Sequence, residues 1–401
     1  MRAHLSRTAR AVVLSLGAAL AVAACSAGPD AATPEAAPAP APTRPGTVTS
    51  STVSSSPSSS GRSSPAPRTT APTTATAADV ATGLATPWGI ALLADGSHLV
   101  SLRDRAQVVK VAVDGAVSDV VATGPGGRVE GVAPQGEGGL LGLAVTPAVP
   151  DTLYAYVSAE NENRVVRMSY DGARLGAPEV LLDGIPRAGF HNGGRLGFGP
   201  DGMLYVTTGD AGRRDASQDR DDLGGKILRL TPDGDPAPGN PFGDSPVWSY
   251  GHRNVQGIGW DAAGRMYASE FGQDTWDELN RIEPGRNYGW PNVEGAGTDQ
   301  DVADGFTRPL RVWRTSDASP SGLAVTDGAI YLAALRGERL WRVPLATDGA
   351  VGTPLALLRG ELGRLRAVEV ERSGSLLVLT DNTGRGRGRD GDDRLARVTL
   401  N

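Results

Sequence analysis

The stretch PDGMLYVT, residues 200–207, contains the pattern that decides the fold. A Pro-Asp-Gly turn precedes a short run of alternating apolar residues, which is typical of a β-strand entered from a tight turn. The pattern recurs along the chain at intervals of roughly 45 to 65 residues, a period that indicates repeated structural units. The six turns precede strands expected at His98–Ser101, Leu153–Val157, Leu204–Thr207, Met266–Ser269, Ile330–Ala333 and Leu376–Leu379.

Six spaced copies of one strand pattern predict an all-β, six-bladed β-propeller with four-stranded blades. A single small sheet cannot bury both of its faces, so each unit is expected to pack against its neighbours around a central channel. The alternatives are a large β-sandwich and a β-helix, but the spacing is too long for β-helix coils and too regular for one sandwich. Ligands of a propeller are expected in the channel, where loops from every blade converge.

Composition agrees with a loop-rich β protein and excludes several partners. The chain has 401 residues, of which 54 are Gly and 29 are Pro, and this disfavours a helical bundle. With 45 acidic against 39 basic residues the net charge is −6, so the folded part lacks the basic surface that nucleic acid or an anionic membrane would require. The single cysteine excludes an internal disulfide and a thiolate metal cluster.

The N-terminal region predicts export and a tether. Residues 1–25 place arginines before an apolar run that is too short to span a bilayer comfortably. The run ends at Cys25 in a sequence that resembles a bacterial lipobox, so we expect a lipid-modified cysteine on the outer face of the cytoplasmic membrane or cell surface; an ordinary signal peptide is the alternative. Residues 26–77 are rich in Ala, Pro, Ser and Thr and predict a disordered linker, which leaves 78–401 for the propeller.

Two polar motifs flank the third repeated strand. His191 lies in the Gly-rich stretch FHNGGRL, residues 190–196, and Asp210 follows the strand in a Thr-Gly-Asp sequence. A histidine in such a loop suits a general base, and a nearby carboxylate would orient its imidazole. The residues alone leave a structural histidine as the alternative.

Cationic and oxygen-rich loops follow. Arg253 and Asn254 offer a guanidinium and an amide that could polarise a carbonyl or clamp an anion. Arg336 and the pair Arg364 and Arg366 bring further guanidinium groups toward the channel, where a multiply carboxylated ligand would be their complement; solvated arginines are the alternative. The stretch SEFGQDTWDELN, residues 269–280, combines flexible backbone with carboxylates, as a calcium site requires.

In order along the chain, these motifs resemble the soluble PQQ-dependent glucose/aldose sugar dehydrogenases, six-bladed quinoprotein propellers. The similarity covers about residues 80–400 and rests on an ordered set of fragments: GGLLG (138–142), HNGGR (191–195), GD (209–210), GGKILR (224–229), GHRN (251–254), NYGWP (287–291) and RLR (364–366). The resemblance implies PQQ and calcium as cofactors, aldose sugars as substrates oxidised at C1 to lactones, and an unidentified external electron acceptor.

The resemblance also implies roles for individual residues. His191 matches the general base, Asp210 its supporting carboxylate, and Arg253 with Asn254 the pair beside the quinone oxygens. The other matches are Arg336, Arg364 and Arg366 to the residues that hold the PQQ carboxylates, Gly272 and Gln273 to the carbonyl ligands of the catalytic calcium, and Glu278 and Tyr288 to ligands of a second, structural calcium.

Three departures accompany this resemblance. Glu137 stands near the quinone where relatives often have Gln, and a carboxylate there would repel an anionic cofactor. Gln273 replaces the Pro of the family, which is harmless if only its carbonyl binds metal. The aromatic that contacts the sugar is not identified by the motifs, and Trp313 is the nearest candidate.

Two functions of other classes are weighed against the dehydrogenase. A non-catalytic extracellular propeller could bind a glycan or a protein, and a metal-dependent lactonase could share the fold. The complete set of His191, Arg253 and the Arg364/Arg366 pair favours the dehydrogenase, because neither alternative needs it.

Overall fold

The computed structural model describes residues 72–385, 388 and 391–401. The predicted signal peptide (1–25), Cys25 and nearly all of the predicted linker (26–77) therefore lie outside the described residues. Strand β1 begins at Ala75, slightly before the domain boundary at 78 that composition suggested. Within the described part of the chain, no helix combines the length and apolar character needed to cross a membrane.

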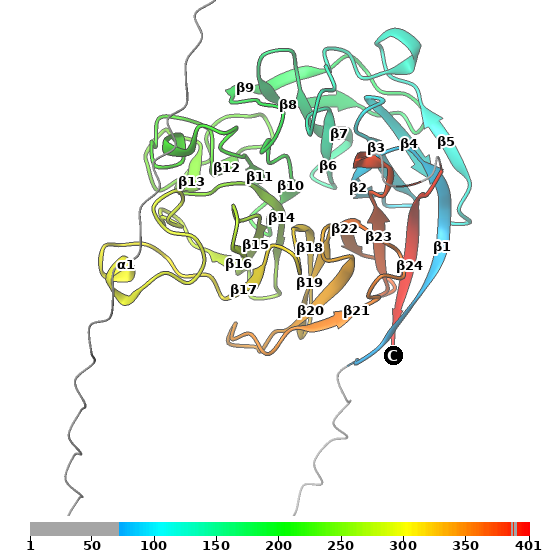
Figure 1. Ribbon diagram of the computed structural model, residues 1–401. Helices are drawn as coiled ribbons and strands as arrows, with labels where there is room; N and C mark the ends of the chain where they lie inside the picture. Colours follow the sequence, from blue (N-terminus) through cyan, green and yellow to red (C-terminus); the bar gives the residue numbers. More distant parts are fainter. Residues whose placement is uncertain (1–71, 386–387, 389–390) are drawn as a thin grey trace, which may run out of the picture. The chain divides into compact units, whose positions relative to one another are not determined.

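Six four-stranded antiparallel sheets are arranged as blades around a centre, as predicted (Figure 1). Blade 1 contains β2 (Pro87–Leu92), β3 (His98–Leu102), β4 (Gln107–Val111) and β5 (Val117–Val120). Blade 2 contains β6 (Leu140–Thr146), β7 (Val149–Ser158), β8 (Asn163–Ser169) and β9 (Glu179–Ile185). Blade 3 contains β10 (Leu196–Phe198), β11 (Leu204–Thr207), β12 (Lys226–Leu230) and β13 (Val247–Tyr250).

The other three blades follow the same order from the centre outward. Blade 4 contains β14 (Val255–Trp260), β15 (Met266–Glu270), β16 (Trp276–Ile282) and β17 (Arg311–Arg314). Blade 5 contains β18 (Pro320–Thr326), β19 (Ala329–Ala334), β20 (Arg339–Pro344) and β21 (Leu355–Leu357). Blade 6 contains β22 (Leu365–Val370), β23 (Leu376–Thr380), β24 (Asp393–Leu400) and β1 (Ala75–Leu84). The described helices are short: η1 (Pro125–Gly127), η2 (Arg214–Ser217), α1 (Asp299–Ala303) and η3 (Thr383–Arg385).

The repeated sequence pattern corresponds to one position in the fold. Each predicted strand is the second strand of its blade, and the turn before it joins it to the innermost strand. Every copy has a residue with positive φ, a conformation that glycine adopts without steric strain; it lies in the turn in five copies and within the first residues of β7 in the other. The residues are Gly96, Asp151, Gly202, Gly264, Gly328 and Gly374. The turn, more than the strand itself, therefore makes the repeat visible in the sequence.

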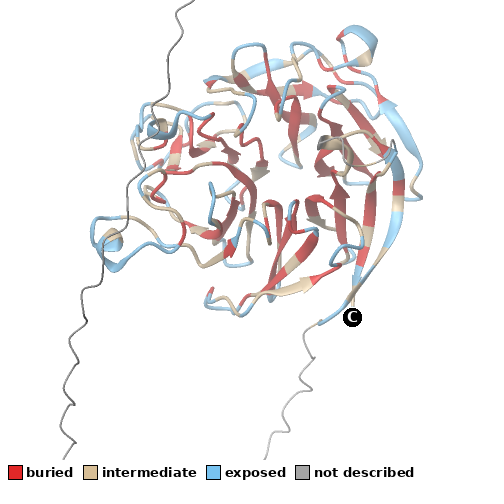
Figure 2. Ribbon diagram, viewed as in Figure 1, coloured by how far each residue is buried: buried red, intermediate tan, exposed pale blue. Residues whose placement is uncertain are grey.

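The hydrophobic core is divided among the interfaces between blades. Six clusters of buried apolar residues are present among the described residues; each joins two neighbouring blades, and one of them also includes Trp88 of blade 1. Tyr154 and Tyr156 of blade 2, for example, pack against Leu204 and Val206 of blade 3. Figure 2 shows the same distribution, with buried residues along the blades and exposed residues at the outer edge of the ring. Burial of both sheet faces by neighbours is the stabilisation that the repeat predicted.

The two ends of the propeller close the ring within one blade. Strand β1 pairs antiparallel with β24, so that Ala75 lies opposite Leu400 and Thr82 opposite Arg394. The N-terminal strand is thus the outermost strand of blade 6, whose other three strands are C-terminal. This pairing joins the first and last described elements by backbone hydrogen bonds and holds the central channel in a fixed shape.

Candidate active site

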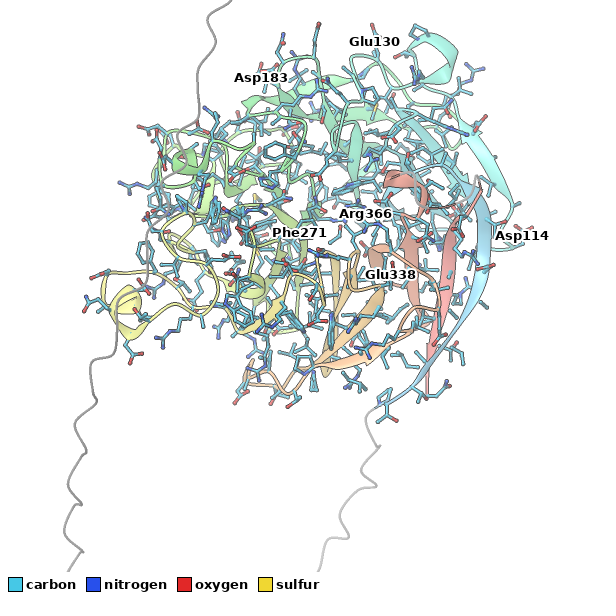
Figure 3. All side chains as sticks on the ribbon, viewed as in Figure 1. Asp114, Glu130, Asp183, Phe271, Glu338 and Arg366 are labelled. Atoms are coloured by element: carbon cyan, nitrogen blue, oxygen red, sulfur yellow. The ribbon has the colours of Figure 1, made fainter. Side chains whose placement is uncertain are left out.

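Loops at corresponding strand ends line two adjoining cavities. The loops follow the second strand of a blade or precede its innermost strand, and these ends lie on the same side because the strands are antiparallel. The first, here called the His191 cavity, has a volume of about 330 Å³. The second, the Arg366 cavity, has about 220 Å³ and shares lining residues with the first. Figure 3 shows Phe271 and Arg366 toward the middle of the ring, while Asp114 and Glu130 lie at its edge.

The structure brings together most of the predicted site residues, which come from blades far apart in the sequence. The predicted residues that line the His191 cavity are Glu137, His191, Arg253, Asn254, Gly272, Gln273, Arg336 and Arg364. The Arg366 cavity adds Arg366 and shares Glu137 and Arg364. Asp210, Glu278 and Tyr288 line neither cavity. Any effect of these three residues on a ligand in the cavities would therefore pass through other residues.

His191 and Asp210 form a hydrogen-bonded pair. The Nδ1 atom of His191 lies 2.8 Å from Oδ1 of Asp210, and the other carboxylate oxygen accepts the indole N–H of Trp290 at 2.8 Å. Burial raises the pKa of Asp210, but hydrogen bonds from His191, Gly212 and Trp290 outweigh it and hold the pKa below its ordinary value. Asp210 therefore stays ionised and fixes the imidazole, which leaves Nε2 as the nitrogen that can accept a proton.

The backbone around this pair is tightly constrained. His191 has a φ of 55°, unusual for a residue other than glycine. A Cβ on Gly209 would lie only 1.9 Å from the His191 carbonyl oxygen, so glycine is sterically required at this position. The backbone N–H of Asp210 donates to the Arg253 carbonyl at 2.8 Å, which ties the loop after β11 to the loop before β14.

Arg253 and Asn254 carry buried donors without a described partner. The Nε atom of Arg253 and the Nδ2 atom of Asn254 are both buried and unpaired within the described part of the chain. Asn254 uses its Oδ1 to accept the Gly193 N–H at 3.0 Å, which fixes the orientation of its amide. Unpaired buried donors are unfavourable, so two of them beside one cavity indicate a place for an acceptor-rich ligand.

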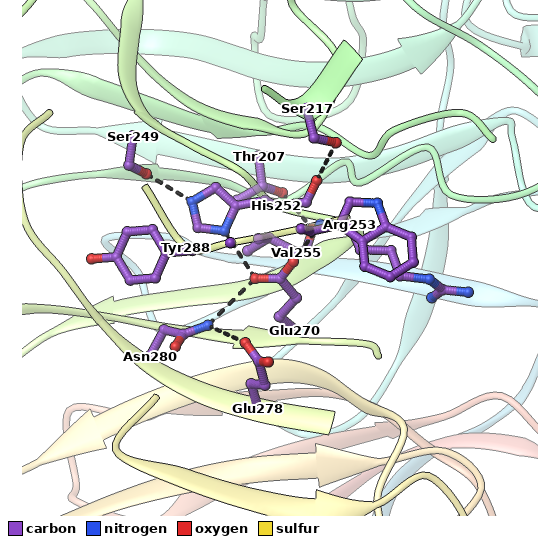
Figure 4. Close-up of polar contacts among 12 residues, drawn as sticks. Thr207, Ser217, Ser249, His252, Arg253, Val255, Glu270, Glu278, Asn280 and Tyr288 are labelled. Atoms are coloured by element: carbon purple, nitrogen blue, oxygen red, sulfur yellow. Dashed lines mark hydrogen bonds and ion pairs between the residues drawn. The ribbon is translucent and has the colours of Figure 1, made fainter. Parts of the chain in front are cut away.

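A buried network lies behind Arg253 (Figure 4). His252 places Nδ1 2.9 Å from Glu270 Oε2 and Nε2 2.9 Å from Ser249 Oγ, and its ring stacks on Tyr288 at 4.7 Å. The other oxygen of Glu270 accepts the backbone N–H of Arg253. Both nitrogens of His252 are thus occupied inside the protein. This histidine has a structural role, whereas His191 keeps one nitrogen for chemistry.

The arginine-rich side of the site contains an acidic residue, Asp381, that no sequence motif indicated. Arg366 is buried and forms an ion pair with Asp381, while its Nη1 donates to Gln256 Oε1 at 2.9 Å. Arg364 donates from Nε to the Asp381 carbonyl at 3.2 Å. Arg336 is exposed at the His191 cavity and makes no hydrogen bond to a described residue. Asp381 thus holds the guanidinium pair in place without any ligand.

Glu137 lies beside both His191 and a further arginine. Its Oε2 accepts the backbone N–H of His191 at 3.2 Å. Arg103, which was also not identified from the sequence, lines the Arg366 cavity. Burial lowers the pKa of Arg103, but Asp104, Asp381 and Glu137 together hold it above its ordinary value. Arg103 therefore adds positive charge on the side of the site where Glu137 lies.

The loop between β15 and β16 presents backbone oxygens to the His191 cavity. Gly272 and Gln273 line that cavity, and neither carbonyl accepts a hydrogen bond from a described residue. Asp277 lines it too and accepts the N–H groups of Gly272 at 3.0 Å and Ser319 at 2.6 Å. Burial raises the pKa of Asp277 to about 6 despite these bonds. Hard oxygen ligands next to a carboxylate are what a calcium ion binds.

Glu278 and Tyr288, the predicted ligands of a second calcium, lie behind this loop. Glu278 is buried and accepts the Gly295 N–H at 2.7 Å and the Asn280 amide at 3.0 Å. Burial and then the charge of Glu270 raise its pKa to about 8. The Tyr288 hydroxyl is already occupied, because it donates to the Arg281 carbonyl at 2.6 Å.

The Tyr288 backbone carbonyl accepts no hydrogen bond from a described residue, so it is the part of Tyr288 that could bind a cation. No described group of three or more His, Cys, Asp or Glu side chains is arranged around a metal position.

Trp313 is wrong as the aromatic of the site. It is buried on β17, the outermost strand of blade 4, and packs 5.8 Å from Trp341 in the core between blades 4 and 5. The exposed aromatic beside the site is Phe190, whose ring is 48% exposed and lies edge-on to His191 at 4.6 Å. Its position directly before the histidine was the available sequence signal.

Comparisons with known proteins agree with this geometry. Residues 84–388 match the Glucose / Sorbosone dehydrogenase family. The PQQ-bound form of the aldose sugar dehydrogenase from Streptomyces coelicolor is 50% identical, with a TM-score of 0.77 over 83% of this chain and 100% of that one. Aldose sugar dehydrogenase YliI of Escherichia coli is 28% identical over 74% of this chain and 87% of its own length. Quinoprotein glucose dehydrogenase B of Acinetobacter calcoaceticus is 33% identical over 48% of each chain.

The family match extends over the described propeller and includes the His191–Asp210 pair, Arg253 and the arginines of blades 5 and 6. The resemblance drawn from the motifs is thus confirmed. The chain belongs to the glucose/sorbosone dehydrogenase family and has the six-bladed propeller of the PQQ aldose sugar dehydrogenases.

Proposed function

We propose that this protein is a PQQ- and calcium-dependent aldose dehydrogenase that oxidises the C1 hydroxyl of aldose sugars to a lactone. The observation that carries the proposal is that His191, fixed by Asp210 from behind, lines one cavity together with Arg253 and Asn254, whose buried donors have no described partner. A general base opposite a cluster of positive charge suits the removal of a proton and a hydride from the same alcohol.

The residues present fit the proposed cofactors. PQQ is a planar, multiply carboxylated quinone, and the cavities offer Arg336, Arg364 and Arg366 for its carboxylates. The unpaired donors of Arg253 and Asn254 suit its oxygens. The carbonyls of Gly272 and Gln273 supply hard ligands for calcium, and Glu278 with the Tyr288 carbonyl would hold a second ion. When bound, PQQ supplies the acceptor for the hydride, and calcium polarises its quinone.

The protein's own groups then perform the remaining steps. His191 Nε2 would take the proton of the C1 hydroxyl as C1 gives up its hydride, so that the C1–O bond becomes the carbonyl of the lactone. Asp210 stabilises the imidazolium that forms. The Arg253 guanidinium is held by the Phe271 carbonyl at 3.2 Å and places positive charge where negative charge develops. The electrons pass afterwards to an external acceptor.

Phe190 would provide an apolar surface for the sugar. Its exposed ring adjoins the base, and the loop at Gly212 supports it, because a Cβ at Gly212 would lie 3.1 Å from the Phe190 ring. A sugar that places its C1 hydroxyl at His191 would bring its C–H face near this ring. Aromatic surfaces of this kind contribute binding energy by apolar contact.

The location of the enzyme is part of the proposal. The apolar run and Cys25 support an exported protein, lipid-anchored at the outer face of the cytoplasmic membrane or cell surface. The Ala/Pro/Ser/Thr-rich stretch after Cys25 would then hold the propeller away from the membrane.

The substitution His191→Ala tests the catalytic assignment. We expect kcat for aldoses in a dye-reduction assay to fall by about 100- to 10,000-fold, the usual contribution of a general base. PQQ binding, measured by absorbance titration, should stay within about twofold of wild type, since the arginines are retained. Full activity in the variant would refute His191 as the base.

A further inference from the structure

The loop that carries Gly272 and Gln273 has an unusual pattern of backbone hydrogen bonds. Four successive N–H groups, those of Gln273, Asp274, Thr275 and Trp276, all donate to Oε1 of Glu294, at 2.9, 3.2, 3.0 and 3.0 Å. The preceding N–H, that of Gly272, donates to Asp277. Consecutive N–H groups that converge on one anion form a nest, in which the backbone rather than side chains provides the charge complement.

Glu294 reaches the loop from a separate segment of the chain. It lies between the Asn287–Pro291 motif and helix α1, and the next residue, Gly295, anchors that segment by donating to Glu278 at 2.7 Å. The fit around the carboxylate is close. A Cβ on Gly272 would lie 1.7 Å from the Trp276 carbonyl oxygen and 2.7 Å from Glu294 Oε1. The loop can therefore keep this shape only with glycine at 272 and the carboxylate in place.

The pattern determines what the loop presents to the His191 cavity. Because its N–H groups are committed to Glu294 and Asp277, the carbonyls of Gly272 and Gln273 remain for a ligand in the cavity that both residues line. A carboxylate that accepts the N–H of a peptide group also increases the negative partial charge on the carbonyl oxygen of that group, which makes the oxygen a better ligand for a cation. The carboxylate thus sets both the direction and the strength of these oxygens.

We propose that Glu294 is the positioning residue of the calcium loop: it touches neither substrate nor cofactor but aims the carbonyls of Gly272 and Gln273 at the cation. This inference rests on the proposed function, because that function places calcium at these two carbonyls. It goes beyond the resemblance, which assigns ligands and no residue that holds the loop.

The test is a calcium titration of the PQQ-loaded protein, followed by the absorption of the quinone, for wild type and for Glu294→Gln. Only a cation that contacts the quinone alters this signal, so the second calcium does not interfere. We expect E294Q to require about 10- to 100-fold more calcium, as is usual when a residue supporting metal ligands is changed. Asp171→Asn is the matched control, since Asp171 also accepts two backbone N–H groups but lines neither cavity, and it should behave as wild type.

The outcomes separate the two levels of the proposal. A wild-type response with an unchanged E294Q titration overturns the role of Glu294 alone. No calcium response in wild type overturns both this role and the calcium site of the proposed function. If E294Q does not fold, hydrogen exchange in calcium-free wild type tests the role of Glu294 instead. The amides of residues 273–276 should exchange slowly, and rapid exchange at all four would refute their hydrogen bonds to Glu294.

Discussion

Asp210 and Asp277 are both buried carboxylates of neighbouring blades, Asp210 in the loop after β11 and Asp277 near the start of β16, yet their surroundings differ. Asp210 has three good donors, including the imidazole of His191, and its pKa is held below the ordinary value. Asp277 has only two backbone donors, and burial raises its pKa to about 6. The charge of Asp210 is thus stabilised by groups of the protein itself, whereas the two donors to Asp277 do not offset the effect of its burial.

The lack of stabilising positive charge extends to the buried carboxylates beside Asp277. Glu278, the neighbour of Asp277, has a pKa raised to about 8, and Glu270 and Glu294 add negative charge nearby. Carboxyl groups that are buried without enough cations are expected to take up protons or to bind a metal. The site therefore has two halves. The half with His191 and Asp210 is preorganised for proton transfer, and the half with the β15–β16 loop, Asp277 and Glu278 would be completed by calcium.

We expect the largest effect on activity from a change in the half that contains His191 and Asp210. Asp210→Asn removes the charge that orients His191 and should lower kcat by about 100-fold or more, in line with the loss of an orienting carboxylate. PQQ affinity should be retained. Asp201→Asn is a suitable control, because Asp201 also forms side-chain hydrogen bonds but lies in the turn between β10 and β11, at the opposite end of β11 from Asp210. Steady-state kinetics with one aldose check this, and a wild-type kcat would contradict the role of Asp210.

The second effect concerns the shape of the incomplete half. Gly272→Ala introduces a Cβ that clashes with the Trp276 carbonyl, so the loop must move, and the calcium needed for half-maximal activity should rise about tenfold or more. Gly189→Ala provides a matched control at the adjoining Arg366 cavity, since a Cβ there meets nothing within 4 Å. Equal calcium requirements in the two variants would show that the loop shape is unimportant.

The third effect is a dependence of stability on pH in the calcium-free protein. Because the folded pKa of Glu278 is about 8 and the ordinary value is 4.5, the native state binds more protons than the unfolded state between these values. Stability should therefore fall as pH rises from about 5 to 8. Melting temperatures in a chelator should show this decline, and calcium should raise them most at high pH. The variant Glu278→Gln should flatten the curve; a curve as steep as that of wild type would assign the decline to other groups.

The smallest effect should appear at the substrate. Phe190→Ala removes an apolar surface but no charged group, so we expect KM for aldoses to rise by roughly 2- to 10-fold with little change in kcat, as suits the loss of one aromatic contact. Val180→Ala, at another exposed apolar residue, should change neither constant. A fall in kcat with unchanged KM would show instead that Phe190 acts by positioning His191.

The sequence predicted the fold well because the repeated turn has a physical requirement. A glycine with positive φ precedes the second strand in five of the six blades, so the period is visible without any structure. His191 and Arg253 could be predicted because they lie in distinctive loops. Asp381, Arg103 and Glu294 could not be predicted, since each gains its role from a partner that is not adjacent in the sequence and that only the folded chain brings near.

The most direct test of the central claim is dye-linked oxidation of a panel of aldoses by the propeller domain from residue 72, with and without added PQQ and calcium. The domain should be prepared free of both and compared at equal protein concentration. We predict activity only when both are present, because the chain provides the base and the arginines but neither the hydride acceptor nor the cation. Aldose oxidation without PQQ, or no oxidation and no PQQ binding when both are supplied, would contradict the account.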